Sequence, residues 1–210
     1  MLKDLLSNRY TAKWWSDDSV DSEKLQYILD CTYLSPSKQG KWNYEIFVLG
    51  NNQKSISIKE WLYWENTYCL DTVRGKEGPI GNRRYNGQIT APIVLVWVAK
   101  DRDNEIFNDC MVSSTITMIA AQEQGLQTGF NGCQGVKDLA KKLDREGSYA
   151  YISLGLGNID KIDGIDNSIQ REVIKDNVKH GFDYGNVDVS VTRGPNRYNK
   201  PKIDALIKHI

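Results

Sequence analysis

Two short segments near the start of the chain carry residues suited to holding an anionic group. Arg9, Thr11 and Lys13 lie close together. A guanidinium can bind a phosphate through two parallel hydrogen bonds, a lysine supplies a mobile point charge, and a threonine hydroxyl adds another donor. Further along, Ser35-Pro36-Ser37 forms a tight backbone corner. Surface cations are more often solvated than bound to a ligand, so the first segment predicts a phosphate site only together with other features.

Other motifs with known chemistry are incomplete or absent from the sequence. Gly155-Leu156-Gly157 is only part of a dinucleotide-binding fingerprint, because Asp160 stands where the third glycine is expected. The four cysteines lie far apart without a Cys-x-x-Cys pair, and there are only two histidines, so we expect no metal site. We also find no P-loop and no Gly-x-Ser-x-Gly nucleophile motif.

The composition is that of an ordinary globular protein. Of the 210 residues, 40% are hydrophobic and 26% are charged. Lys plus Arg and Asp plus Glu number 27 each, so we expect neither nucleic acid nor an anionic membrane as a partner. Residues 1–6 lack the apolar core of a signal peptide, and no stretch reaches the roughly 20 apolar residues that cross a bilayer. We therefore expect a cytoplasmic protein with free thiols.

A capped helix separates the two segments that open the chain. Asp21 is placed to cap a helix from about residue 21, and Val20 and Leu25 can form its hydrophobic staple. Pro36 disfavours helical geometry in the preceding residue, so the helix ends near the Ser-Pro-Ser corner. Residues 44–50 alternate weakly between apolar and polar side chains and predict a strand.

The middle of the chain has a less regular pattern. Residues 61–68 carry aromatic and apolar side chains at helical spacing and predict an amphipathic helix. Residues 75–87 are basic and loop-like. The nearly continuous apolar run over residues 92–99 then predicts a strand in the middle of a sheet. Asn108 or Asp109 is expected to cap the long helix that follows.

The last regular elements end before residue 160. The long helix is expected to end near Gly125, followed by a short strand and a glycine-rich turn up to residue 132. A helix over residues 136–143 and another central strand over residues 150–155 complete the pattern. We predict one α+β domain spanning residues 1–210, in which approximately residues 160–210 form an extended C-terminal arm.

The order of these segments resembles that of the FMN-dependent nitroreductase family. The shared order is Arg-Tyr-Thr-Ala-Lys, one capped helix, Ser-Pro-Ser, an aromatic-flanked strand, an apolar strand, a long helix and an Asn-Gly turn. The resemblance covers about residues 5–50 and 88–158, with a looser similarity at the C-terminus. It implies a central, mostly antiparallel sheet flanked by helices, with a C-terminal arm that embraces the partner subunit of a homodimer.

The resemblance also implies which residues bind FMN at the start of the chain. Arg9 and Thr11 would contact the phosphate. Tyr10 would contribute its backbone and pack beside the ribityl chain, and Lys13 would approach the pyrimidine edge of the ring. Pro36, Ser37 and their neighbours would come from the second subunit.

Further FMN contacts are implied later in the chain. Phe130, Asn131, Gly132 and Cys133 would lie along the ring near its N5 atom. The basic pair that meets the phosphate from the tail best matches Lys200 and Lys202, with Arg197 as a competing candidate.

The sequence also departs from the family's pattern. After Ser-Pro-Ser the family has an asparagine and then Gln-Pro-Trp, whereas this chain has Gly40 and then Trp42-Asn43-Tyr44. Gly40 is retained as a site residue, and Lys38, Gln39 or Asn43 can replace the lost polar contact. The family also has a basic or amide residue at the site that precedes the central strand. In this chain Arg83, Arg84 and Asn86 all lie in range of that position, and the choice among them stays open.

We therefore expect an FMN-dependent homodimer that takes electrons from NADPH or NADH and reduces a small conjugated acceptor, such as a nitroaromatic or a quinone. Residues 55–88 are the candidates for a substrate lid. Two alternatives remain open. One is a relative with specialised chemistry, such as dehalogenation, ring oxidation or flavin fragmentation. The other is a flavin-binding protein without turnover.

Overall fold

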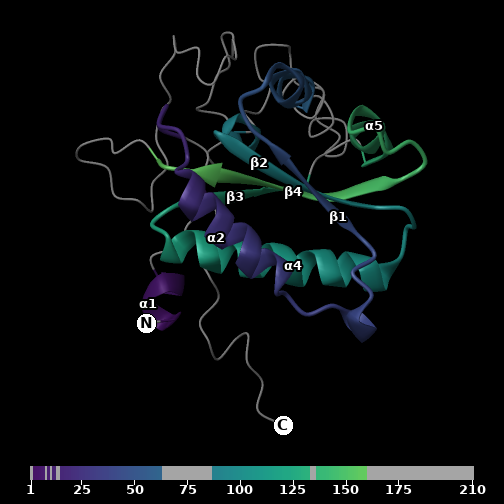
Figure 1. Cartoon of the computed structure of the whole chain (residues 1–210), viewed down its shortest axis with the longest axis horizontal. Helices are drawn as coiled ribbons and strands as arrows, with labels where there is room; N and C mark the ends of the chain where they lie inside the picture. Colours follow the sequence, from purple (N-terminus) through teal and green to yellow (C-terminus); the bar gives the residue numbers. More distant parts are fainter. Residues whose placement is uncertain are drawn as a thin grey trace, which may run out of the picture.

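This computed structural model describes residues 2–7, 9, 11–12, 15–62, 87–132 and 136–159, which contain helices and the strands of one sheet. The other residues lie outside the description. In chain order, the elements (Figure 1) are α1 (Leu2–Ser7), α2 (Ser22–Tyr33), the 3-10 helix η1 (Lys38–Gly40), β1 (Glu45–Leu49), a helix over residues 53–62, the 3-10 helix η3 (Gly87–Thr90), β2 (Ile93–Ala99), α4 (Asn104–Glu123), β3 (Gln127–Asn131), α5 (Val136–Lys142) and β4 (Tyr149–Gly157).

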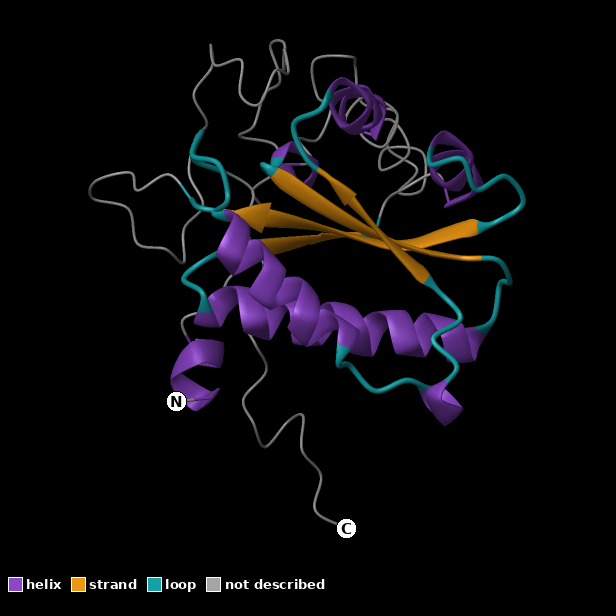
Figure 2. Ribbon diagram, in the orientation of Figure 1, coloured by secondary structure: helices purple, strands orange, loops and turns teal. Residues whose placement is uncertain are grey.

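The described strands form one sheet in the order β1-β2-β4-β3, and every neighbouring pair is antiparallel (Figure 2). β2 lies between β1 and β4, and its residues from Val94 to Ala99 are all buried. The expected central strand is therefore confirmed, and the sheet is antiparallel as the resemblance implied. Both faces of β2 must be covered, which explains its nearly continuous apolar sequence.

Alternate side chains of β2 enter two different apolar layers. Leu95 and Trp97 pack with Ile106 and Cys110 of α4, whereas Val94 and Val96 lie in the cluster on the other face. α2 and α4 cover the first face, and the helix over residues 53–62 and α5 cover the second (Figure 1). The sheet thus forms the middle of three layers.

The N-terminus of α2 matches the prediction. The side chain of Asp21 accepts hydrogen bonds from the backbone N–H groups of Glu23, at 2.9 Å, and Lys24, at 3.0 Å. Val20 and Leu25 pack against the same apolar cluster, as expected of a hydrophobic staple. The cap determines where α2 starts, and the length of α2 determines where the Ser-Pro-Ser corner lies.

The start of α4 contradicts the prediction. Its N-cap is Asp103, not Asn108 or Asp109, and Asp103 Oδ1 accepts the Glu105 N–H at 2.6 Å. The prediction started the helix too late, because it relied on the apolar residues from Met111 onward and overlooked Ile106 and Phe107 in the first turn. Asp109 lies inside the helix, so its carboxylate is free of a capping role.

The C-terminus of α4 is as expected. Gly125 has φ +76°, in the left-handed region that favours glycine. The Leu126 N–H donates to the Ala121 carbonyl at 2.9 Å, and the Gly125 N–H donates to the Gln122 carbonyl at 3.1 Å. These two bonds form a Schellman motif, which ends the helix and directs the chain into β3.

The helix before the central strand begins earlier than predicted. Its described part covers residues 53–62 and so includes the first two residues of the helix predicted over residues 61–68, whereas residues 63–68 lie outside the described part. Ile58 and Leu62 are buried in the core. Residues 63–86 lie outside the described part, so a lid within them stays a prediction, whereas residues 55–62 belong to a core helix.

Lys59 is a buried lysine on this helix. Its side chain is fully buried, and Nζ donates to the carbonyls of Ala91 and Pro92 at 3.1 and 3.0 Å. Burial disfavours the charged form and lowers the pKa of Lys59 to about 8, from its usual 10.5. The lysine joins this helix to the turn that precedes β2.

We predict that the free energy of unfolding rises with pH because of Lys59. A lowered pKa means that the unfolded chain binds the proton more tightly, so stability grows as the pH increases from about 8 to 10.5 and both states lose the proton. The gain should be about 3 kcal/mol. Urea denaturation of wild type and Lys59→Met across this range measures it. Lys54→Met, which removes an exposed lysine of the same helix, is the control; equal pH slopes in wild type and Lys59→Met would contradict the prediction.

Candidate functional site

The N-terminal segment lies against the edge strand β3. Thr11 forms a parallel bridge with Thr128, and the Ala12 N–H donates to the Thr128 carbonyl at 2.9 Å. Ala12 is buried, whereas Thr11 and Arg9 are half-buried. The structure thus brings Thr11, one of the predicted phosphate ligands, to the strand that leads to Asn131 and Gly132, and Arg9 precedes it by two residues.

This close approach depends on the absence of a side chain at Gly129. A Cβ there would clash with the Ala12 carbonyl oxygen and would lie 2.7 Å from Cγ of Gln88. Backbone cannot give way as a flexible side chain can, so any larger residue would displace the N-terminal segment. Residues 11–12, η3 and β3 therefore meet at Gly129.

The predicted residues at the end of β3 differ in their exposure. Asn131 is buried, its carbonyl accepts the Ser153 hydroxyl at 3.3 Å, and Gly132 is exposed. A Cβ at Gly132 would meet no atom of the described residues within 4 Å. Phe130 points to the opposite face from Gly129 and packs against the cluster that includes α4. Only its backbone faces the side of the N-terminal segment.

Several predicted ligands cannot be placed. Tyr10, Lys13, Cys133, Lys200 and Lys202 lie outside the described residues, as does Arg197. The same holds for Arg83, Arg84 and Asn86. Their roles remain predictions.

The Ser-Pro-Ser corner lies at the other end of the sheet. Ser37 Oγ donates to Asp109 Oδ2 at 2.8 Å, near the start of α4. The loop continues into β1, whose Glu45 pairs with Val98 near the end of β2, whereas Thr128 pairs with Leu156, the partner of Ile93 at the start of β2. At about 3.3 Å per residue, the two predicted parts of the site are separated by on the order of 15 Å or more within one chain.

The loop itself has an unusual backbone. Pro36 and Gly40 are exposed and Ser37 is half-buried. Gln39, Gly40 and Trp42 have φ values of 56°, 64° and 41°. Positive φ is uncommon for residues with a side chain, so specific contacts must hold this conformation.

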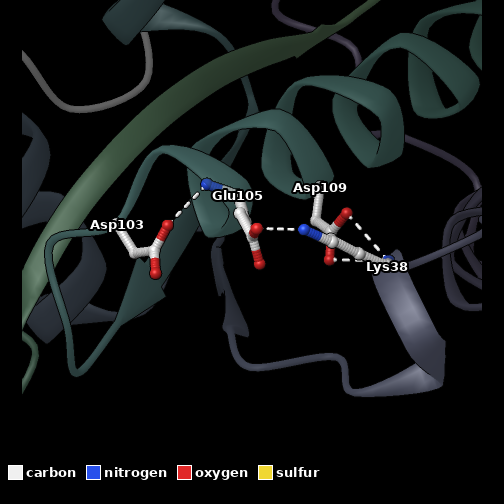
Figure 3. A network of polar contacts seen from close by, with 4 residues as sticks. All are labelled: Lys38, Asp103, Glu105 and Asp109. Carbon is white, nitrogen blue, oxygen red and sulfur yellow. Dashed lines mark hydrogen bonds and ion pairs between the residues drawn. The ribbon is translucent and has the colours of Figure 1, made fainter.

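Polar contacts from α4 hold the loop (Figure 3). In addition to the Ser37 hydroxyl, Asp109 accepts the backbone N–H of Lys38. The Lys38 nitrogen lies 3.0 Å from Oδ1 and 3.1 Å from Oδ2 of the carboxylate. The Lys38 ammonium forms an ion pair with Glu105, one turn earlier. Sequence reasoning missed the role of Asp109, because the contact joins residues far apart in the chain and only the general preference for acidic helix caps was visible.

A separate cavity of about 470 Å³ opens near this loop. Its lining includes Trp42, Tyr44, Glu45, Lys100 and Arg145. Of the residues considered for cofactor contacts only Asn43, a candidate replacement for the lost polar contact, lines it among the described residues. The guanidinium of Arg145 binds the Glu45 carboxylate, and this hydrogen bond lowers the pKa of Glu45. The cavity therefore lies apart from Thr11 and β3.

Two further features, a metal site and a membrane span, are absent from the described part of the chain. Among these residues, no group of histidine, cysteine and acidic side chains is arranged to hold a metal ion. None of the described helices is both long and apolar enough to span a bilayer.

Comparison with solved structures shows a shared fold. A nitroreductase with bound FMN from Bacteroides fragilis is 14% identical, with a TM-score of 0.63 over 84% of this chain and 96% of that one. An FMN- and NADPH-dependent nitroreductase from sphigopyxis sp. strain HMH, solved as a mutant, is 15% identical, with a TM-score of 0.61 over 76% and 88%.

An iodotyrosine deiodinase bound to FMN and 3-iodo-L-tyrosine shares this fold as well. It is 16% identical to the present chain, with a TM-score of 0.65 over 83% of this chain and 97% of its own. At these identities the likeness establishes the fold, an α+β arrangement with a four-stranded antiparallel sheet flanked by helices. No curated protein sequence matches the chain significantly.

A family comparison covers most of the sequence. The profile of the Nitroreductase family matches residues 6–156. This span includes the N-terminal segment at Thr11, the Ser-Pro-Ser loop, α4 and β3. The chain therefore belongs to the nitroreductase family.

Proposed function

We propose that this chain is an FMN-dependent oxidoreductase that takes electrons from NADPH or NADH and reduces a small conjugated acceptor of the nitroaromatic or quinone type. The observation that carries the proposal is the docking of residues 11–12 on the β3 backbone at Gly129, in a chain of the nitroreductase family. When bound, FMN supplies hydride transfer at N5, from the nicotinamide and then to the acceptor in a ping-pong sequence.

The donors near β3 fit the phosphate of such a cofactor. Arg9 offers a guanidinium and Thr11 a hydroxyl, and both are half-buried rather than fully solvated. In the proposal Tyr10 lies beside the ribityl chain and Lys13 faces the pyrimidine edge, where a cation stabilises negative charge. Lys200 and Lys202 would add charge from the tail.

The end of β3 fits the flat ring. Because no described atom lies within 4 Å of a Cβ at Gly132, a planar group could approach the backbone of residues 130–132 closely. Because the Phe130 side chain packs toward α4, its contribution would come from the backbone alone. This arrangement excludes a bulky side chain from the place where a planar group must lie.

A second copy of the chain would complete the site. The Ser-Pro-Ser loop and Arg9 belong to opposite ends of the sheet, so one chain does not bring Pro36, Ser37 and Gly40 to the phosphate ligands. In a homodimer the loop of one subunit can reach the FMN of the other. The proposed enzyme is therefore a homodimer with its flavin sites at the subunit interface.

An exposed apolar face supports this assembly. Phe107, Met111 and Val112 of α4 are 40%, 38% and 41% exposed, and Tyr33 and Leu34 at the end of α2 are 78% and 77% exposed. Large exposed apolar patches commonly mark interfaces between proteins. The face adjoins the loop that the proposal assigns to the partner's site, so a second copy is its proposed occupant.

The test of the function is the visible spectrum of the protein reconstituted with FMN. We expect flavin absorption bands that NADPH or NADH bleaches without oxygen, and that a nitroaromatic or a quinone restores. Bands restored only by a halogenated phenol such as 3-iodotyrosine would favour the dehalogenating alternative. Bands that no nicotinamide bleaches would favour flavin binding without turnover. Failure to bind FMN would contradict the proposal.

Arg9→Ala should weaken FMN binding by about 1.5–3 kcal/mol, the scale of a hydrogen bond to a charged group. Titration of the apoprotein with FMN, followed by flavin fluorescence, measures the dissociation constant. Arg102→Ala, which removes an exposed cation beyond the end of β2, is the control and should leave the constant unchanged. Equal affinities for wild type and Arg9→Ala would remove Arg9 from the site.

Met111→Glu should weaken the dimer by about tenfold or more, because an unpaired carboxylate would be buried at the interface. Analytical ultracentrifugation over a dilution series measures the dimer dissociation constant. Lys137→Glu on α5, on the opposite side of the sheet, should have no such effect. Unchanged association of Met111→Glu would place the interface elsewhere.

A further inference from the structure

We propose that Asp109 is a positioning residue that holds residues 35–42 in the shape in which this loop serves the partner subunit's FMN site. The inference rests on the proposed function, because only an FMN site shared between two subunits gives the loop this role. It assigns to an internal residue of α4 a part in cofactor binding without direct contact with the cofactor.

The carboxylate of Asp109 uses both oxygens on the loop. Oδ2 accepts the Ser37 hydroxyl at 2.8 Å. The Lys38 backbone nitrogen lies 3.0 Å from Oδ1 and 3.1 Å from Oδ2 (Figure 3). Hydrogen bonds to a charged acceptor are stronger than those between neutral groups. One side chain on a rigid helix thus fixes two consecutive residues of the loop.

Ser37 passes this constraint on to the rest of the loop. Its Oγ accepts the Trp42 backbone N–H at 2.9 Å, and the Trp42 indole N–H donates to the Ser35 carbonyl at 3.2 Å. The single hydroxyl proton of Ser37 is already donated to Asp109, so Ser37 does not donate a hydrogen bond to a ligand in this arrangement. Its role is to close the loop, which leaves Pro36 and the loop backbone to meet the partner's flavin.

The backbone of the loop requires such an anchor. Gln39 and Trp42 have side chains and yet adopt positive φ, with Gly40 between them. Such conformations persist only where surrounding contacts over-determine them. The contacts through Asp109 and Ser37 enclose this stretch from both ends.

The neighbouring ion pair offers a matched control. The Lys38 ammonium pairs with Glu105, one turn before Asp109, but the side chains of this pair are 49% and 52% exposed. Exposed ion pairs contribute little because water and salt screen them. Glu105→Gln removes a carboxylate from the same helix while the contacts of Asp109 with the loop remain.

Asp109→Ala should raise the FMN dissociation constant of the dimer about tenfold, the loss of one charged hydrogen bond. Asp109→Asn should lie between Asp109→Ala and wild type, because its side-chain oxygen still accepts the Lys38 N–H. Glu105→Gln should bind FMN as wild type does. Fluorescence titration of each full-length dimer measures the constants. If Asp109→Ala does not fold, Asp109→Asn and Ser37→Ala carry the same test.

A mixed dimer distinguishes positioning in trans from a general loss of stability. In a dimer of one Asp109→Ala subunit and one Arg9→Ala subunit, one site combines both defects, whereas the other combines an intact Arg9 with an intact loop. We therefore expect one of its two sites to bind FMN with wild-type affinity, although both mutant homodimers bind weakly. Two subunits with different affinity tags allow this dimer to be isolated.

The outcomes separate the two proposals. If wild type does not bind FMN, the proposed function itself fails. If wild type binds FMN and Asp109→Ala binds equally well, Asp109 has no positioning role, while the proposed function stands. If Asp109→Ala binds weakly but both sites of the mixed dimer remain weak, the loop does not act on the partner's site and the inference is wrong.

Discussion

The position of the N-terminal segment depends on two glycines of the sheet, Gly129 and Gly155, where the backbone of residues 12 and 88 crosses the strands. A Cβ at Gly129 or Gly155 would clash with the carbonyl oxygen of Ala12 or Gln88. Trp15 lies over the same stripe, 3.0 Å from the position of a Cβ at Gly155. Because these positions lack side chains, the N-terminal segment and η3 reach the sheet backbone directly. Thr11, a candidate phosphate ligand, thereby lies beside the backbone of β3.

α4 connects the two parts of the candidate site. Its first turns hold the Ser-Pro-Ser loop through Asp109, and its Schellman motif at Gly125 directs the chain into β3. The helix is long enough to run along the whole sheet, at about 1.5 Å per residue. The two parts therefore lie at opposite ends of a rigid element, and flexibility within one chain does not readily bring them together.

This separation gives the proposed dimer a physical basis. The apolar residues exposed on α4 and at the end of α2 adjoin the loop, so burying them against a second copy would also place that loop at the neighbouring chain. Association would then create the flavin site at the same time as it removes apolar surface from water. Cofactor binding and dimer formation would stabilise each other, because FMN and the second subunit would both bind the same folded conformation of the chain.

Local sequence signals determined much of the fold. The Asp21 cap, the apolar run of β2 and the Gly125 terminus each depend on a few neighbouring residues, and all three were predicted. The start of α4 was misplaced because Asn108 and Asp109 are also suitable capping residues, and the pattern of neighbouring residues alone did not favour Asp103 over them. Only the tertiary structure decided that Thr11 meets Thr128 and that Asp109 anchors Ser37, 72 residues away. Such contacts depend on how the sheet and helices pack, which short-range periodicity does not encode.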